Sequence, residues 1–185
     1  MKFIIEHMEP ELSEWCTAEY GHIAQIMGKH NVMFTNLSPK QADKLRSFGE
    51  PFTKPVKQLN LKKACILDHN AKERMTKKDA EHFDYFIFGG ILGNNPAEGR
   101  TKLLTKEMAY PTRNLGNKQF STDTAVYVAK QLLKGKKLED IRFIEEVEIQ
   151  IDDEESMIIP FPYAVEDNKL IISDDLVEHI RKGGF

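Results

Sequence analysis

The chain has 185 residues, of which 41% are hydrophobic and 30% are charged. A chain of this size buries about 70% of its unfolded surface around one core, so we expect a single domain over residues 1–185. The composition is that of an ordinary globular protein and differs from disordered or membrane compositions. The net charge of −3 disfavours a protein that grips phosphate backbones unaided, because such proteins usually carry a strongly basic face.

Two further classes of protein are disfavoured by the sequence. The longest apolar run, residues 85–92, is far shorter than the ~20 residues of a bilayer-spanning helix. The N-terminus becomes acidic at Glu6, before the apolar core of a signal peptide could form, so we expect a cytoplasmic protein. Cys16 and Cys65 lack the paired spacing that holds zinc. We therefore expect two buried free thiols and no metal site.

The first half of the chain alternates between patterns of strands and helices. Short β-rich or apolar runs predict strands at residues 2–7, 32–35, 64–67 and 85–88. Apolar spacing and caps predict helices from Leu12 to Met27, from Pro39 towards Phe48 with Ser38 as N-cap, and from a cap at Thr76 to about Phe83. Residues 49–63 contain two prolines and several lysines and predict a loop or short irregular helices.

The second half begins with a predicted strand at residues 112–115 and a helix from Ser121 to Lys134 that ends at Gly135. A strand-rich extension over residues 142–185 follows, with predicted strands at 142–151, 157–165 and 169–172, a turn at 166–168 and a helix at 174–181. This order predicts an α/β fold with a mostly parallel sheet flanked by helices, plus a C-terminal β-hairpin and helix. Ligands of such sheets bind at the carboxyl ends of the strands.

One candidate ligand loop follows the strand at residues 85–88 and reads Phe88-Gly89-Gly90-Ile91-Leu92-Gly93. Glycines after a strand allow backbone amides to approach a ligand closely. The spacing matches neither a Walker P-loop nor a dinucleotide-binding fingerprint. A tight turn without a ligand is the alternative explanation.

A second candidate loop covers residues 113–124, with Gly116 inside it and the helix beginning at Ser121 or Thr122. Helix capping, with Asp123 in the first turn, would explain this composition without a ligand. A third candidate is the acidic stretch with Glu6, Glu9 and Glu14. Acids at the start of a helix are usually a solvated cap, and Trp15 would ordinarily belong to the core.

The two polar loops together resemble those of the SPOUT-class methyltransferases, both in their order along the chain and in their amino-acid sequence. In that class a strand ending in glycines and a Leu-Gly loop that opens the next helix hold S-adenosylmethionine within a trefoil knot. The resemblance therefore implies a trefoil knot and this cofactor. It also implies cofactor contacts at Phe88, Gly89, Gly90, Leu92, Gly93, Leu115, Gly116, Gln119, Phe120, Ser121 and Thr122.

The chain is most similar to one branch of that class, which includes proteins described as predicted RNA methyltransferases and a eukaryotic arginine methyltransferase of a small-subunit ribosomal protein. The similarity covers almost the whole chain and is carried by Glu6-His7-Met8-Glu9, Ser13-Glu14-Trp15, Glu19-Tyr20, Phe83-Asp84-Tyr85-Phe86, Arg100-Thr101 and Pro160-Phe161. The chain departs from the branch at Asn94 and Asn114, where an acid and an arginine are expected. These departures concern the substrate more than the cofactor.

An arginine substrate would give the acidic residues a role. A guanidinium, with a pKa above ~12, offers no lone pair until a proton leaves, and carboxylates hold and orient it. We therefore expect Glu6, His7 and Glu14 to be catalytic and the substrate to contact Glu9, Trp15, Arg100 and Asp123. The expected substrate is a basic protein, and the resemblance implies a ribosomal one.

Two other functions stay open at this stage. An RNA methyltransferase would need a basic surface, which could be built from Lys54, Lys57, Lys62, Lys63, Lys72 and Arg74. A non-catalytic module that binds ribosomes or RNA would keep the fold without binding the cofactor. The sequence also leaves open whether the protein is a monomer or a homodimer.

Overall fold

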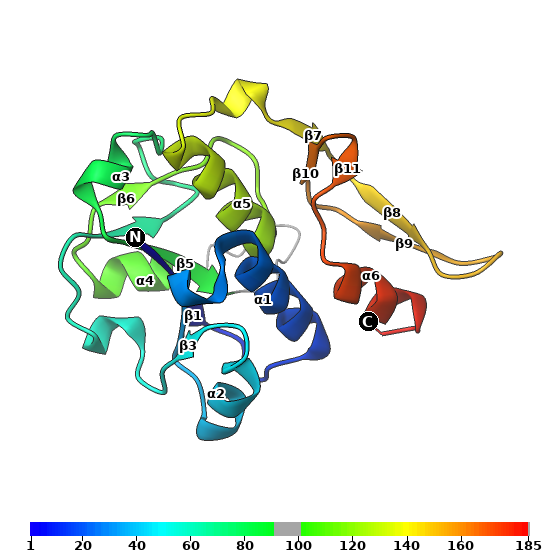
Figure 1. Cartoon of the computed structure of the whole chain (residues 1–185), viewed down its shortest axis with the longest axis horizontal. Coiled ribbons are helices and arrows are strands. Elements are labelled where there is room, and N and C mark those ends of the chain that lie inside the picture. The colour runs from blue at the N-terminus through cyan, green and yellow to red at the C-terminus, as the bar shows by residue number, and fades with distance from the viewer. Residues whose placement is uncertain (91–100, 185) are drawn as a thin grey trace.

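A computed structural model describes residues 1–90 and 101–184 of the chain. Its centre is a parallel sheet of six strands in the order β3-β2-β1-β5-β4-β6 (Figure 1). The strands are β1 (Lys2–His7), β2 (Val32–Thr35), β3 (Glu50–Pro51), β4 (Ala64–Leu67), β5 (Tyr85–Gly90) and β6 (Thr112–Arg113). The predicted α/β fold with a mostly parallel sheet is confirmed.

The helices follow from capping and apolar spacing. They are α1 (Glu14–Met27), α2 (Pro39–Leu45), α3 (Asp79–His82), α4 (Thr101–Glu107), α5 (Thr122–Leu133) and α6 (Asp174–Arg181), with short 3-10 helices η1 (Lys29–Asn31), η2 (Val56–Gln58) and η3 (Leu138–Asp140). Ser38 caps α2 as predicted, because its side chain accepts from the backbone N–H of Gln41 and the Gln41 side chain accepts from the N–H of Ser38.

Helix α3 begins two residues later than a cap at Thr76 predicts. The carboxylate of Asp79 accepts a hydrogen bond from the Thr76 N–H at 2.7 Å. This bond closes residues 76–78 into a separate turn, so the helix begins only at Asp79. Helix α2 also ends earlier than predicted, at Leu45 instead of near Phe48.

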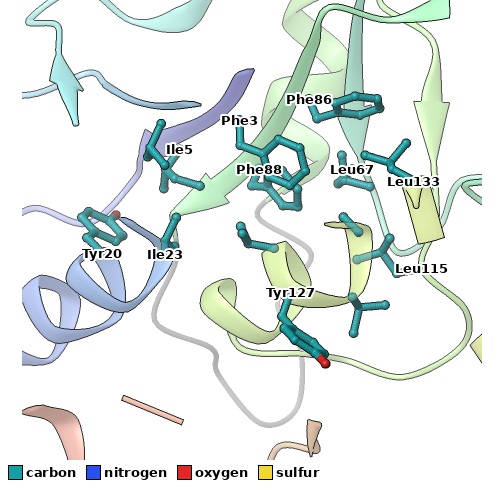
Figure 2. Packing of buried hydrophobic residues seen from close by; sticks show 14 of the residues in the cluster. Phe3, Ile5, Tyr20, Ile23, Leu67, Phe86, Phe88, Leu115, Tyr127 and Leu133 are labelled. Carbon is teal, nitrogen blue, oxygen red and sulfur yellow. The ribbon is translucent and has the colours of Figure 1, made fainter. Parts of the chain in front are cut away.

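Side chains of the parallel strands alternate between two apolar layers. Phe3 and Ile5 of β1 face α1, α2 and α5, whereas Ile4 faces η2 and α4. Figure 2 shows the first layer, with Phe3, Phe86 and Phe88 grouped on the sheet, Tyr20 of α1 beside Ile5, and Tyr127 on α5. The sheet is therefore buried on both faces, as continuous apolar strands predict.

The carboxyl ends of several strands meet at one edge of the sheet. In the register of β1 and β5, Glu6 is opposite Gly89 and His7 is opposite Gly90. Strand β6 joins the same edge through β4, with Leu67 opposite Arg113. The chain crosses from β3 on one side of β1 to β4 on the other, so the order reverses near β1, and such reversals favour a ligand crevice.

The C-terminal extension contains more strands than predicted. Residues 142–151 form β7 (Arg142–Ile144) and β8 (Val147–Gln150), which are separated by two glutamates. Residues 157–165 divide into β9 (Ser156–Ile159) and β10 (Tyr163–Glu166) at Pro160-Phe161-Pro162, where the prolines have no N–H for a ladder. The predicted hairpin joins β10 to β11 (Lys169–Leu170), with Asp167 and Asn168 at φ 50° and 59°.

The extension packs against α1 (Figure 1). Leu176 and Ile180 of α6 share one apolar cluster with Ala18 of α1 and with residues of β8 and β9. Ser173, the N-cap of α6, also donates a hydrogen bond to the Ala18 carbonyl at 3.2 Å. The first residue of β10, Tyr163, is fully buried in this cluster.

Three other predictions concern the path of the chain and the absence of special features. The trefoil knot depends on residues 91–100, which lie outside the described residues, so the knot stays a prediction. Cys16 and Cys65 are buried free thiols, as predicted. Within residues 1–90 and 101–184, no three side chains of the metal-binding types form a group that could hold an ion, and no helix is long and apolar enough to cross a membrane.

Gly90 is fixed by packing between the end of β5 and α1. A Cβ atom there would lie 2.2 Å from the Tyr20 hydroxyl and 2.9 Å from Cγ2 of Ile5. The Tyr20 ring cannot retreat easily, since it stacks on Phe34 at 5.1 Å and its hydroxyl lies 2.9 Å from Nδ1 of His7. Any side chain at position 90 therefore strains the core.

We expect Gly90→Ala to lower the free energy of unfolding by about 1–3 kcal/mol. The same change should cost less in a Tyr20→Phe background, because the hydroxyl that the new methyl group meets is absent. Denaturant unfolding of the four proteins of this double-mutant cycle measures the difference. Gly21→Ala is the control, since its Cβ would meet only the Phe48 ring, at 3.4 Å. Equal costs of Gly90→Ala in both backgrounds would contradict the packing argument.

Candidate functional site

The predicted acidic cluster after β1 is not formed. Glu6 is buried, and its Oε2 accepts hydrogen bonds from the Thr35 hydroxyl and from the Val56 N–H, the latter at 2.9 Å. Burial raises the pKa of Glu6, although these two hydrogen bonds oppose the shift. The side chain of Glu14 is 85% exposed and lies 3.0 Å from Nδ1 of His179 in α6. Glu6 thus ties β1 to β2 and η2, whereas Glu14 pairs with α6.

His7 lies on the opposite face of the sheet from Glu6, because side chains alternate along a strand. Its Nδ1 is 2.9 Å from the Tyr20 hydroxyl and its Nε2 is 3.4 Å from Nε2 of Gln41. Burial lowers the pKa of His7, so the ring is held neutral near neutral pH. Glu9, predicted to contact the substrate, is half-buried in the loop before α1.

The structure instead brings two other carboxylates together. Glu19 of α1 is 5% exposed and Asp123 of α5 is 0% exposed. We call these two residues the buried acid pair. Trp15 donates its indole N–H to Oε1 of Glu19 at 2.9 Å. Nδ1 of His22 lies 2.7 Å from Oδ2 of Asp123. One face of α1 therefore reaches the first turn of α5.

Asp123 is also bonded within its own helix start. The Ser121 hydroxyl donates to its Oδ1 at 2.6 Å, and the Thr124 N–H donates to the same atom at 2.8 Å. Donors at the first turn of a helix and the helix dipole both stabilise a negative charge at this position. Asp123 is thus held in one orientation by groups of α1 and α5.

The two carboxylates influence each other's proton. Burial, followed by the charge of Asp123, raises the pKa of Glu19 to about 8, while hydrogen bonds from Trp15 and Thr122 oppose the shift. Two buried carboxylates at close range cannot both ionise without a large cost. At neutral pH, Glu19 therefore carries a proton. A cation placed beside the pair could therefore replace this proton and balance the charges of both carboxylates.

Tyr163, the first residue of β10, lies near the buried acid pair. It is fully buried, and burial together with the charges of Asp123 and Glu19 raises the pKa of its phenol far above the usual value. The phenol is therefore un-ionised. The site combines residues from α1, the start of α5 and the C-terminal extension.

The loop between β6 and α5, predicted to bind the cofactor, is held by its own side chains. Gly116 has φ +103°, and its N–H donates to Oδ1 of Asn114 at 2.9 Å. Leu115 is buried in the core, and the ring of Phe120 stacks on Phe143 with centroids 5.2 Å apart. Because these side chains turn inward, a ligand would meet the loop mainly through its backbone.

The glycine loop after β5 is described only in part. Phe88 is 3% exposed and lies 5.2 Å from the Phe3 ring, so its side chain belongs to the core. Gly89 and Gly90 end the strand beside β1. Predicted site residues Leu92, Gly93 and Arg100 lie outside the described residues. The cofactor contacts predicted for both loops, including Gln119, Ser121 and Thr122, stay predictions.

Sequence reasoning did not select Glu19, His22 or Tyr163. A usable signal existed for two of them, because Trp15, Glu19 and His22 are four and then three residues apart and so share one helix face. Their partner Asp123 is 101 residues from His22. That distance along the chain hides the pairing from local patterns.

The family described as protein arginine N-methyltransferase SFM1-like matches residues 2–184 of the chain. Protein arginine N-methyltransferase SFM1 of Saccharomyces cerevisiae is 35% identical over 205 residues, which cover 98% of this chain and 95% of the relative. The crystal structure of yeast SFM1 with SAM superposes with a TM-score of 0.88 and 34% identity, covering 99% of this chain and 91% of that one.

A more distant likeness supports the fold. Trm10 from Thermococcus kodakaraensis has a TM-score of 0.59 and 14% identity, and the match covers 75% of this chain and 95% of that one. Identity this low shows the shared fold only. The family match and the yeast relative, in contrast, extend over almost the whole length. The chain belongs to the SFM1-like family of protein arginine N-methyltransferases.

Proposed function

We propose that this protein transfers a methyl group from S-adenosylmethionine to an arginine side chain of another protein. The yeast relative is an arginine methyltransferase whose structures were solved with SAM, SAH and MTA. The single observation on this chain that carries the proposal is the buried acid pair, formed by Glu19 of α1 and Asp123 at the start of α5. Carboxylates are the groups that a guanidinium requires.

The cofactor would bind between the ends of β5 and β6. S-adenosylmethionine supplies an electrophilic methyl group on a sulfonium. Gly89 and Gly90 and the backbone of residues 114–121 would hold it, and the positive φ of Gly116 suits a loop that presents its amides. The inward side chains of Leu115 and Phe120 fit this use, because they leave the main chain to meet the ligand.

The acid pair would bind and orient the guanidinium of the substrate. A nearby cation lowers the pKa of a carboxyl group. Entry of the guanidinium would therefore release the proton of Glu19, and both carboxylates would then hold the planar cation. One of the two carboxylates would then accept the proton that the guanidinium nitrogen gives up as it takes the methyl group. Alignment at near-attack distance supplies much of the rate of such a transfer.

Glu6 and His7 are engaged in contacts that hold the sheet edge together. The contacts of Glu6 with Thr35 and Val56, and those of His7 with Tyr20, suit residues that shape the sheet edge. We therefore place the acid function on Glu19 and Asp123. Catalytic roles for Glu6, His7 and Glu14 stay predictions. Among the residues expected at the substrate, Trp15 would act by fixing Glu19.

A basic protein is the proposed substrate, with a ribosomal protein and a cytoplasmic location as finer parts of the proposal. Residues 143–165 contain seven carboxylates and no Lys, Arg or His, although the whole chain has a net charge of only −3. Most of these acids lie in or beside the β8–β9 hairpin, which extends from the parallel sheet (Figure 1). Such a surface attracts basic polypeptides and repels phosphate backbones.

Of the basic residues that an RNA substrate would require, Arg74 lies beside the second cofactor loop, because its backbone forms a bridge with Asn114. Lys63 precedes β4, at the opposite edge of the sheet from its carboxyl end. Lys57 pairs with Glu107 and Arg74 pairs with Glu139, each at 2.9 Å. These contacts favour the protein substrate over the RNA alternative.

The proposed function predicts that the transferred methyl group is found in protein and not in RNA. The protein, incubated with radiolabelled S-adenosylmethionine and a ribosomal extract, should give label that resists nuclease and disappears with protease. Acid hydrolysis should release methylated arginine. Label that is lost with nuclease instead would contradict the protein substrate and support the RNA alternative.

The raised pKa of Glu19 predicts how stability depends on pH. The folded protein holds the Glu19 proton up to about pH 8, whereas the unfolded chain releases it near its ordinary value. Stability from this group is therefore complete at low pH and is lost as pH rises through that window. Glu19→Gln cannot ionise, so its melting temperature relative to the unmodified protein should rise between pH 5 and pH 8.5.

Activity separates this effect from function. Glu19→Gln should lose about 100-fold or more in turnover while it still binds S-adenosylmethionine in calorimetry. Glu81→Gln is the matched control, because the Glu81 side chain is exposed in α3 and no role in the site is assigned to it, and it should show neither effect. A constant difference in melting temperature across the pH range would show that Glu19 is ionised in the folded protein.

The acidic hairpin predicts a salt-dependent affinity for the substrate. Asp153→Asn, Glu154→Gln and Glu155→Gln together remove exposed charges, and they spare Asp152, whose Oδ1 accepts the N–H groups of the turn. The apparent KM for a ribosomal protein fraction should rise several-fold at low salt with kcat unchanged, because exposed charges act mainly on encounter. The difference should vanish at ~0.5 M salt.

A triple variant elsewhere tests whether position matters. Asp43→Asn, Glu81→Gln and Asp84→Asn neutralise the same number of exposed carboxylates away from the hairpin. Their apparent KM should stay close to that of the unmodified protein. An equal rise in both triple variants would mean that net charge, not the hairpin, attracts the substrate.

A further inference from the structure

The hydroxyl of Tyr163, close to the buried acid pair, is buried without a hydrogen bond to any part of the chain that the structure describes. The residue is 0% exposed, and its Oη has no hydrogen-bond partner among the described residues. Most buried hydroxyl groups in folded proteins are bonded, because an unbonded one loses its water without compensation. The position of this atom therefore needs a physical explanation.

Packing fixes the Tyr163 ring independently of the hydroxyl. The ring belongs to the apolar cluster between α1, α6 and the β8–β9 hairpin. Its backbone begins β10, where Tyr163 is opposite Ile144 of β7. A phenylalanine would keep all of these contacts and would leave no polar atom without a partner. The hydroxyl therefore adds nothing to the packing of the cluster.

The polar groups near the hydroxyl are already engaged. The Ser121 hydroxyl lies near enough to the phenol to oppose the rise in its pKa, but its proton is donated to Oδ1 of Asp123 at 2.6 Å. Oε1 of Glu19 accepts from Trp15, and Oδ2 of Asp123 lies 2.7 Å from Nδ1 of His22. Tyr163 shares its apolar cluster with Trp15, which donates to Glu19, so the phenol lies close to the pair, and the charges of both carboxylates act on it.

We propose that Tyr163 is a substrate-contacting residue of the guanidinium site, whose oxygen accepts an N–H of the incoming arginine beside the buried acid pair. The inference rests on the proposed function. A guanidinium has five N–H donors in one plane, and two carboxylates on one side cannot satisfy all of them. The phenol supplies an acceptor from a different element at a fixed place. It thereby favours a planar cation over the compact ammonium of lysine.

This role explains why an unbonded hydroxyl is retained in the core. The phenol is left without a partner in the free protein and gains one when the substrate binds. Sites of this kind exchange some stability of the free protein for selective binding. The C-terminal extension would then contribute directly to the site and not only cover α1.

The test is Tyr163→Phe in the full-length protein. Its melting temperature should equal or exceed that of the unmodified protein, because a hydroxyl without a partner is removed. Calorimetry should give an unchanged affinity for S-adenosylmethionine. With a salt-extracted ribosomal protein fraction as methyl acceptor, kcat/KM should fall about 10- to 100-fold, which is the range for a hydrogen bond to a charged group.

Tyr127→Phe is the matched control. Tyr127 lies in α5, and its phenol is influenced by Glu166 and Gln131, away from the acid pair. This variant should keep the activity of the unmodified protein, with a melting temperature that is equal or slightly lower. The two variants delete the same atom type from the same residue type, so only the position of the hydroxyl differs.

Two results with Tyr163→Phe would overturn the inference. An unchanged kcat/KM would show that the hydroxyl does not contact the substrate. A clear fall in melting temperature together with weaker binding of S-adenosylmethionine would show a structural role. If the unmodified protein in the same assay gives no protease-sensitive label, the proposed function itself fails and the inference falls with it. The unmodified protein alone reveals this failure, so it is distinct from a failure of the inference about Tyr163.

Discussion

The contact between His22 and Asp123, at 2.7 Å, is the interaction on which the site depends. It joins α1 to the start of α5 across 101 residues of sequence. The loop that precedes α5 is placed by the same contact, since Ser121 at its end bonds to Asp123. Residues proposed for the cofactor and for the substrate are therefore held by one buried polar group. Burying such a group requires partners on every side, and α1, α5 and their caps supply them.

Charge balance is the second constraint. A buried pair of carboxylates is costly, and the pair lowers this cost by keeping a proton on Glu19. A planar cation could replace that proton. The pair therefore costs stability in the free protein and favours binding of a cation. Tyr163 follows the same principle, because its phenol is buried without a partner. Both features suit a protein in which the substrate supplies the missing positive charge and the missing hydrogen-bond partner.

The remaining elements divide the work around this centre. The parallel sheet brings the ends of β1, β5 and β6 to one edge. Glu6 and His7 shape that edge from opposite faces of β1, through β2 and η2 on one side and α1 on the other. The C-terminal extension adds a buried phenol to the site and an acidic hairpin outside it. This arrangement suits a basic polypeptide that approaches along the hairpin.

Local chemistry in the sequence determined the elements that depend on near neighbours. The cap at Ser38, the helix at residues 174–181 and the turn at residues 167–168 rely on bonds within a few residues, and they were predicted correctly. The alternation of strand and helix patterns predicted the parallel fold, and the resemblance to a known family predicted the activity. Tertiary structure alone decided that Glu6 and Glu14 lie apart, because strand alternation and the path of α1 send them to different neighbours. It also decided that Glu19, Asp123 and Tyr163 lie close enough for their charges to act on one another, since proximity between residues from three distant segments has no signature within any one of them.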